Sequence, residues 1–263
     1  MGIIILILVL ILLLNPKVLP GLGSWLGGRS RKPYRQARWV WSSLSGTEDE
    51  AIRAEFEYGR ECARAFAGQF SGSASPGDQE LAAGIGARLA SAVKDPRRRF
   101  RFNVAVSPVA NAFALPGGFV FITDSLLELC GRNRDETAFF LGHEIGHVLR
   151  GHAKDHLMAN TFLNAVSSRL PAAGRMLREV IGKGYARTLE FEADEEAVRL
   201  AAAAGFDPRA SLSALKRLEQ AAPGPSGLAE YLSSHPSMKE RIGRISLSLR
   251  AFEAGLEGSK TQS

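Results

Sequence analysis

The pentad His143-Glu144-Ile145-Gly146-His147 constrains this chain more than any other feature of its sequence. On a helix, two histidines four residues apart project from the same side, and the glutamate between them lies about 100° around the axis. Two imidazoles with a carboxylate beside them suit a zinc ion and its bound water. The alternative is a pair of structural histidines on an amphipathic helix. Because the chain has only 5 histidines in 263 residues, the pattern rarely arises by chance, and we favour the metal site.

A third ligand is expected from the acidic segment 187–194, because catalytic zinc usually has three protein ligands and one open position. Glu190 and Asp194 are four residues apart and share a helical face, whereas Glu192 points to the opposite side. Glu190 would bind the metal, and Asp194 would accept a hydrogen bond from a ligating histidine. The alternative for Glu190 is a solvated helix in an acidic run. Small residues flank both ligand faces and would let the two helices approach closely: Gly142, Gly146, Ala193 and Ala197.

Beside these candidate ligands, the other candidates for the site are Glu144 and three further histidines. Glu144 is the expected general base, since it lies beside the metal-bound water. His152 and His156 lie about 140° and 180° around a straight helix from His147, which indicates surface or second-shell roles. His235 precedes a proline on a loop, and an isolated histidine of this kind is by default structural.

The N-terminus predicts membrane attachment. Residues 2–14 are uncharged, but as a helix they span about 20 Å, short of a bilayer core of about 30 Å. A signal peptide and a retained anchor both remain open, and we favour the anchor. Five of the positive charges behind the net charge of +6 lie within residues 29–38, where they suit lipid headgroups better than nucleic acid. The positive-inside rule would then place the main domain in the cytoplasm.

The chain divides into four regions. We expect an N-terminal hydrophobic anchor or uncleaved signal over 1–28, a basic juxtamembrane linker and helix over 29–75, a metallopeptidase domain over 76–252 and a polar tail over 253–263. Asn133 and Glu136 resemble a capping box that opens the helix of the pentad. Periodicity predicts strands over 102–106 and 119–123, with a turn at 116–118 before the second strand. It predicts helices over 48–70, 78–93, 124–130, 134–156, 159–169, 172–183, 186–204, 208–221 and 237–252.

Four segments together resemble the membrane-associated gluzincin metallopeptidases, the family of the HtpX, BepA, Oma and CaaX prenyl proteases. The first is Asn111-Ala112-Phe113-Ala114-Leu115-Pro116-Gly117-Gly118-Phe119-Val120-Phe121, which resembles the family's strand segment. The second is the pentad helix with His152 beyond it. The others are the R-x-x-E-x-x-A-D motif at 187–194 and the H-P-x-x-x-x-R-I motif at 235–242.

The resemblance implies an α+β, zincin-like metallopeptidase that is mostly helical, with a small β-sheet beside the HExxH helix. It implies one zinc ion per chain, bound by His143, His147 and Glu190, with Glu144 as the catalytic base. His235 would stabilise the oxyanion or occupy the open coordination position. Asp194 and Arg187 would form the second shell. Strand 119–123 would be a sheet edge that pairs with extended substrate, through Asn111, Phe119, Val120 and Phe121.

We therefore predict a zinc-dependent metalloendopeptidase in membrane-associated protein quality control, with proteins or peptides as substrates. The alternative is a zinc-bound chaperone-like or latent binding module. The single hydrophobic segment argues against a prenyl protease. Because several family members with one anchor act outside the cytoplasm, the membrane face stays open, and the sequence indicates neither the natural substrate nor the oligomeric state.

Overall fold

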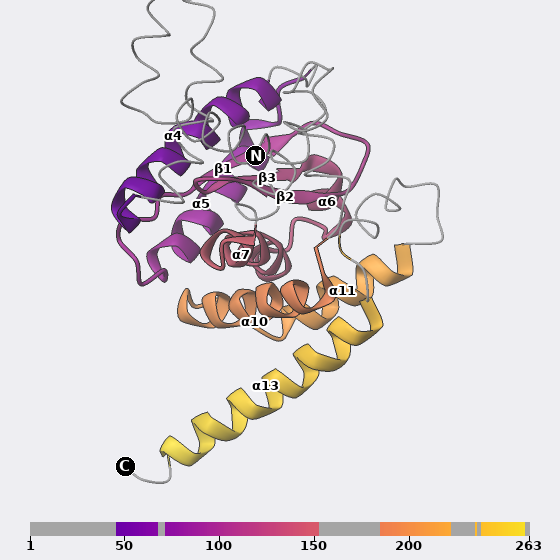
Figure 1. Cartoon of the computed structure of the whole chain (residues 1–263). Helices are drawn as coiled ribbons and strands as arrows, with labels where there is room; N and C mark the ends of the chain where they lie inside the picture. The colour runs from indigo at the N-terminus through magenta and orange to yellow at the C-terminus, as the bar shows by residue number, and fades with distance from the viewer. Residues whose placement is uncertain (1–45, 68–71, 153–184, 222–234, 236–237, 261–263) are drawn as a thin grey trace, which may run out of the picture.

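The computed structural model describes residues 46–67, 72–152, 185–221, 235 and 238–260. The helices are α4 (Glu48–Ala67), α5 (Pro76–Ser91), α6 (Asp124–Leu129), α7 (Arg134–Leu149), α10 (Arg187–Ala203), α11 (Ala210–Ala221) and α13 (Met238–Lys260). The strands are β1 (Arg101–Ala105), β2 (Ala112–Leu115) and β3 (Phe119–Thr123). The three-stranded sheet lies between α4 on one face and α5 and α7 on the other, and α10, α11 and α13 pack beyond α7 (Figure 1). The mostly helical α+β fold class is confirmed.

The sheet has the order β1-β3-β2, with β3 parallel to β1 and antiparallel to β2. Successive side chains of β3 point to opposite faces, as in any strand. Phe119 and Phe121 belong to the apolar cluster under α4, whereas Val120 and Ile122 belong to the main core on the α7 side. The periodicity of the sequence had predicted only two strands; β2 lies within the segment that the family resemblance marks as strand.

The turn between β2 and β3 requires glycine. Gly117 and Gly118 have φ values of +74° and +84°, which side chains with a Cβ rarely adopt. A Cβ on Gly117 would lie 2.5 Å from the Cα of Phe56 on α4, and one on Gly59 would lie 1.7 Å from the carbonyl oxygen of Pro116. The turn and α4 therefore meet backbone to backbone, so α4 packs directly on the sheet. The predicted domain boundary at residue 76 stays a prediction.

Two polar contacts fix the start of α7. The Asn133 side chain accepts hydrogen bonds from the backbone N–H groups of Asp135 and Glu136, both at 3.0 Å, as expected of an N-cap. The Glu136 carboxylate does not complete a capping box; it pairs with Arg217 of α11 at 2.9 Å. Nearby, Asp78 at the start of α5 forms an ion pair with Arg132 at 2.7 Å, which ties α5 to the turn before α7.

The prediction for the end of the pentad helix was wrong by about two turns. α7 ends at Leu149 rather than near 156, because Gly151 takes a φ of +76° and turns the chain back. α13 continues to Lys260, beyond the predicted 252 and into the expected tail. The predicted anchor and linker up to residue 45 and the predicted helices over 159–169 and 172–183 lie outside the described residues. Among the helices that the structure describes, none is long and apolar enough to cross a membrane.

Candidate metal centre

The centre is built where α7 crosses α10. A Cβ on Gly146 would lie 3.0 Å from the carbonyl oxygen of Ala193, and one on Gly142 would lie 3.3 Å from the Cα of Ala197. The two helix backbones thus approach as closely as the small residues in the sequence predicted. This approach brings the ligand faces of the two helices together in the core.

Four buried side chains meet at this crossing: His143 and His147 of α7, Glu190 of α10, and His235, which precedes α13 in the sequence. Each offers one nitrogen or oxygen, and these atoms all lie within 4.8 Å of one another. The Nε2 atoms of His143 and His147 are 3.1 Å apart, and they lie 3.5 and 3.4 Å from the oxygens of Glu190. His235 Nδ1 lies 2.9 Å from Glu190 Oε2 and 3.4 Å from His143 Nε2.

These distances fit a zinc ion. Donors at the usual Zn–N distance of about 2.0–2.1 Å in a tetrahedron are about 3.3 Å apart, which is close to the separations seen here. One oxygen each of Glu190 and Glu144 is buried without a hydrogen-bond partner. A buried carboxylate oxygen left in this way is costly, and a bound cation would satisfy it. The side chains present therefore suit one metal ion.

The choice of Glu190 over Glu192 agrees with the geometry. Glu190 is fully buried among the histidines, whereas the Glu192 side chain is 44% exposed and faces Arg150 and His152. Glu192 is therefore a natural control for the ligand assignment, which itself stays a prediction.

The ionisation of these groups is set by burial and by their partners. Burial would raise the pKa of Glu190, but the charge of His235 and the close contacts with all three histidines outweigh it and hold that pKa well below its usual range. Burial lowers the pKa of His147 to about 3, which leaves its imidazole neutral for a metal. Burial and the charge of Arg241 act to lower the pKa of His143, yet hydrogen bonds with Asp194 and Glu190 raise it to about 9.

Asp194 of α10 contacts His143, and its role in orienting this candidate ligand stays a prediction. Its Oδ1 lies 2.9 Å from Nδ1 of His143, which turns Nε2 toward the other donors. Arg241 of α13, which is fully buried, in turn donates to both oxygens of Asp194 at 2.7 and 2.8 Å. Burial would raise the pKa of Asp194, but Arg241 and His143 lower it below its usual value, so the carboxylate stays charged.

One side chain that we expected behind the metal ligands lies elsewhere. Arg187, which we expected near the metal, opens α10 at the surface, where its 67% exposed side chain pairs with Glu240 at 3.2 Å. It lies at the N-terminus of α10, outside the ligand cluster, and the buried guanidinium belongs to Arg241 instead. Arg241 was visible in the sequence only as part of the H-P-x-x-x-x-R-I motif.

Two further side chains contact His147. Because the chain turns at Gly151, the Nδ1 atoms of His152 and His147 lie 3.0 Å apart. This is the second-shell alternative that the sequence left open for His152, reached by a turn rather than by a straight helix. The ring of Tyr185 stacks on His147 with centroids 3.9 Å apart, a contact that no sequence pattern indicated. His156 lies outside the described residues.

Glu144 lies in the same buried space as the donor cluster. It is 2% exposed, and its Oε1 lies 3.9 Å from Nε2 of His235. Burial raises its pKa above the usual value for a carboxyl, which suits a group that must accept and return a proton near neutral pH.

The predicted substrate strand needs correction. Phe119, Val120 and Phe121 belong to β3, which pairs with β1 on one side and β2 on the other, so its backbone has no edge for a substrate. Asn111 immediately precedes β2, where its backbone is bonded to Thr123 and its side-chain Oδ1 is buried without a hydrogen-bond partner. Within the part of the chain that the structure describes, β1 and β2 are the edge strands.

Comparison with known proteins agrees with this site. The pattern of peptidase family M48 matches residues 78–248. The mitochondrial metalloendopeptidase OMA1 of Schizosaccharomyces pombe is 33% identical over 159 residues, covering 56% of this chain and 46% of that protein. The mitochondrial metalloendopeptidase OMA1 of Homo sapiens is 31% identical over 160 residues, covering 53% of this chain and 30% of that protein. The metalloprotease LoiP of Escherichia coli is 24% identical over 156 residues, covering 55% of this chain and 60% of that protein.

The chain spans less than half the length of the OMA1 proteins it matches. The family match nevertheless covers more than half of the chain and contains the pentad, Glu190, Asp194 and His235. The family, the zincin-like fold and a site for zinc, all predicted from the sequence, are confirmed. The chain belongs to peptidase family M48.

Proposed function

We propose that this protein is a zinc-dependent endopeptidase that hydrolyses peptide bonds of protein substrates, with one zinc ion per chain. The observation that most supports it is the convergence of His143, His147 and Glu190 beside the buried carboxylate of Glu144. When bound there, zinc supplies a Lewis acid that activates water and polarises the peptide carbonyl.

The chain's own groups then move the proton. Glu144 takes a proton from the attacking water and returns it to the leaving nitrogen, a role that its raised pKa favours. Asp194 holds His143 in the orientation that presents Nε2, and Arg241 keeps Asp194 charged and fixed. His235, with Nε2 3.9 Å from Glu144, would donate to the oxyanion of the tetrahedral intermediate.

For substrate binding we propose β2 in place of β3. β2 is an edge strand of the described sheet and packs against α7, which bears the pentad. An extended peptide could add to this edge and lie along α7, with specificity from the alternate side chains. The buried Oδ1 of Asn111, just before β2, would accept a hydrogen bond from such a peptide.

A latent form is the second candidate, because His235 lies in the donor cluster itself. Its Nδ1 lies 2.9 Å from Glu190 Oε2 and 3.4 Å from His143 Nε2, a position from which it could fill the open coordination site. We expect His235→Ala to separate the two roles. Oxyanion donation predicts a fall in kcat of about 10²–10³, whereas latency predicts a gain in activity.

We further propose attachment to a membrane through the hydrophobic segment 2–14 and the basic cluster at 29–38, and a role in protein quality control there. We infer the role in protein quality control from the proteolytic relatives and from the single apolar segment of the sequence. Partition of the full chain into the membrane fraction, and its loss on deletion of residues 1–28, would test the attachment.

Zinc removal tests the proposed activity as a whole. The full chain should cleave a denatured protein, lose that activity with a chelator such as 1,10-phenanthroline and regain it with one equivalent of zinc. Activity that persists in a chain shown by atomic absorption to contain no zinc would contradict the proposal.

A further inference from the structure

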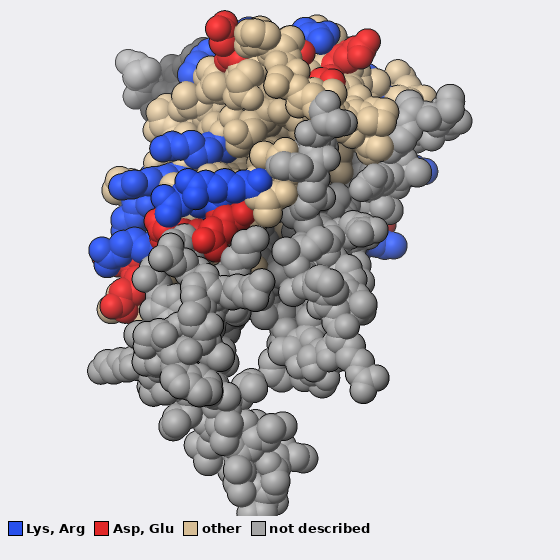
Figure 2. Space-filling view, turned by 90° about the horizontal axis from the view of Figure 1, so that it is seen from above, with Lys and Arg blue, Asp and Glu red and all other residues tan. Residues whose placement is uncertain are grey.

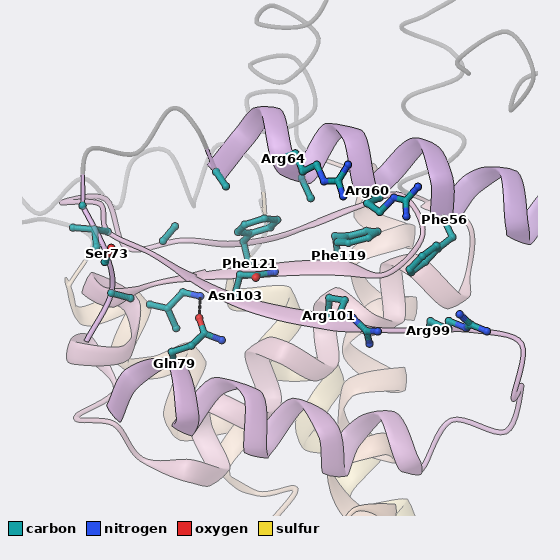
Figure 3. Close-up of a pocket in the computed structure, with 17 residues that line it drawn as sticks. Phe56, Arg60, Arg64, Ser73, Gln79, Arg99, Arg101, Asn103, Phe119 and Phe121 are labelled. Atoms are coloured by element: carbon teal, nitrogen blue, oxygen red, sulfur yellow. Dashed lines mark hydrogen bonds between the residues drawn. The ribbon is translucent and has the colours of Figure 1, made fainter. Parts of the chain in front are cut away.

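A second candidate site lies on the face of the sheet away from the metal centre. From the α4 side, Lys and Arg side chains form a band with acidic side chains along one border (Figure 2). A cleft of about 740 Å³ opens between α4 and the adjacent face of β1 (Figure 3). The cleft exists because α4 packs on β2 and β3, so that no described helix covers the same face of β1.

The floor of the cleft is apolar. It is formed by Phe56 and Ala63 of α4, Ala105 of β1, and Phe119 and Phe121 of β3. The faces of the two β3 rings are already occupied: Phe119 packs against Phe56 with centroids 5.2 Å apart, and Phe121 stacks on Phe113 at 5.2 Å. The floor therefore offers hydrocarbon surface but no free ring face on which a nucleobase could stack.

The rim of the cleft is basic, and none of the described lining residues is acidic. It is formed by four arginines: Arg60, Arg64, Arg99 and Arg101. Arg60 pairs with Glu57, while Arg99 lies over the ring of Phe56 and Arg101 donates to a backbone carbonyl. Within the described residues, three of the four guanidinium groups thus have no carboxylate partner. Guanidinium groups suit phosphate because their planar fork can donate two parallel hydrogen bonds.

A peptide is disfavoured as the ligand, because the outer edge of β1 is already occupied. The side chain of Gln79 accepts a hydrogen bond from the N–H of Val104 at 3.0 Å (Figure 3). It also donates to the carbonyl oxygen of Phe102 at 2.9 Å. These two backbone groups are the ones that an added strand would need. An extended peptide could therefore not pair with β1 beside the cleft.

We propose that this cleft binds one anionic phospholipid, with the phosphodiester on the arginine rim and the first part of an acyl chain on the apolar floor. The volume is in the range of about 300–1,000 Å³ that holds a single small ligand, well above the need of a free phosphate. Its position also fits: α4 begins at Glu48, and the roughly ten residues back to Arg38 span at most about 35 Å. Only this last argument rests on the proposed membrane attachment.

The test uses the full chain with Glu144→Gln, which prevents self-cleavage, in a neutral detergent. Dihexanoyl-phosphatidylglycerol below its micellar concentration is titrated in a calorimeter, with dihexanoyl-phosphatidylcholine and inorganic phosphate as separate probes. The test variant is Arg64→Gln with Arg101→Gln. The charge-matched control, Lys216→Gln with Arg250→Gln, changes two exposed cations on α11 and α13.

We expect saturable binding of phosphatidylglycerol, at least about tenfold weaker in the test variant because two charge-assisted contacts are lost, and unchanged in the control. Ala67→Trp, which places a ring in the cleft from an exposed position of α4, should also weaken binding. Unchanged zinc content and thermal midpoint would show that the variants are folded. Equal binding of phosphatidylcholine, binding of phosphate as tight as that of the lipid, or equal affinity in test and control variants would each overturn the proposal. Because binding is measured without catalysis, its failure would leave the proposed peptidase activity untouched.

Discussion

Replacement of Arg241 by methionine is the perturbation whose effect can be worked out most fully from the structure. Arg241 is fully buried and donates two hydrogen bonds to Asp194, which in turn contacts His143. Methionine keeps most of the length and apolar volume but leaves the Asp194 carboxylate buried without its cation. Loss of one partner of a buried ion pair costs about 3–5 kcal/mol.

The same change should weaken metal binding. A second-shell partner of a metal-ligating histidine typically contributes a factor of about 10–100 in metal affinity, or about 1.4–2.7 kcal/mol. We expect Arg241→Met to lower the free energy of unfolding in urea by about 3 kcal/mol and the zinc affinity, measured against a chromophoric chelator, by at least about tenfold. Lys239→Met, on an exposed position of the same helix, is the matched control and should change neither.

A double-mutant cycle isolates the pair. Asp194→Asn in the Arg241→Met background removes the uncompensated charge, so part of the lost stability should return, whereas the two changes would be additive if the residues did not interact. The reasoning is refuted if Arg241→Met matches the parent in both zinc affinity and stability, or if the two losses simply add.

Three further predictions concern the ligand choice, the packing of α4 and the response to acid. Glu190→Gln should release zinc and Glu192→Gln should retain it; equal zinc contents by atomic absorption would contradict the ligand assignment. Gly59→Ala should destabilise the fold by about 1–3 kcal/mol, because the added Cβ overlaps with Pro116. Gly84→Ala, whose added Cβ has no atom within 4 Å, should stabilise the fold by up to about 1 kcal/mol. Both changes are measured from urea unfolding midpoints. A hydrogen bond with Arg132 lowers the pKa of Asp78 below its ordinary value of 3.8. This ion pair therefore stabilises the fold fully above pH 3.8, and the stabilisation is lost as the pH falls through the folded-state pKa. Asp78→Asn should lower the free energy of unfolding more at pH 7 than at pH 3, and an equal loss at both would show that the pair does not contribute.

Most of the described helices and the cluster of side chains that could hold a metal were predictable, because the residues that determine them lie close together in the sequence. The helical phase of residues 187–194 alone distinguishes buried Glu190 from Glu192, whose side chain is 44% exposed. Gly142 and Gly146 indicate a close helix crossing. A helix face is fixed by spacing within one segment, so a single sequence is enough to assign it.

The misplaced features depend on contacts between distant segments. Whether β3 is an edge or a centre depends on β2, a four-residue strand too short for a clear alternating pattern. Arg187 and Arg241 both stand in motifs with acidic neighbours, and only the packing of α13 against α10 decides which one is buried. His152 could be placed at the centre only once Gly151 was known to end α7.

The central claim is that Glu144 is the base of a zinc-dependent peptidase, and Glu144→Gln tests it most directly. This nearly isosteric change keeps every proposed metal ligand and removes only the proton acceptor. The measurement is cleavage of a denatured protein by parent and variant, each with its zinc content determined by atomic absorption. The account predicts one zinc per chain in both and no detectable cleavage by the variant. Cleavage by a zinc-loaded Glu144→Gln chain at the parent's rate would contradict it.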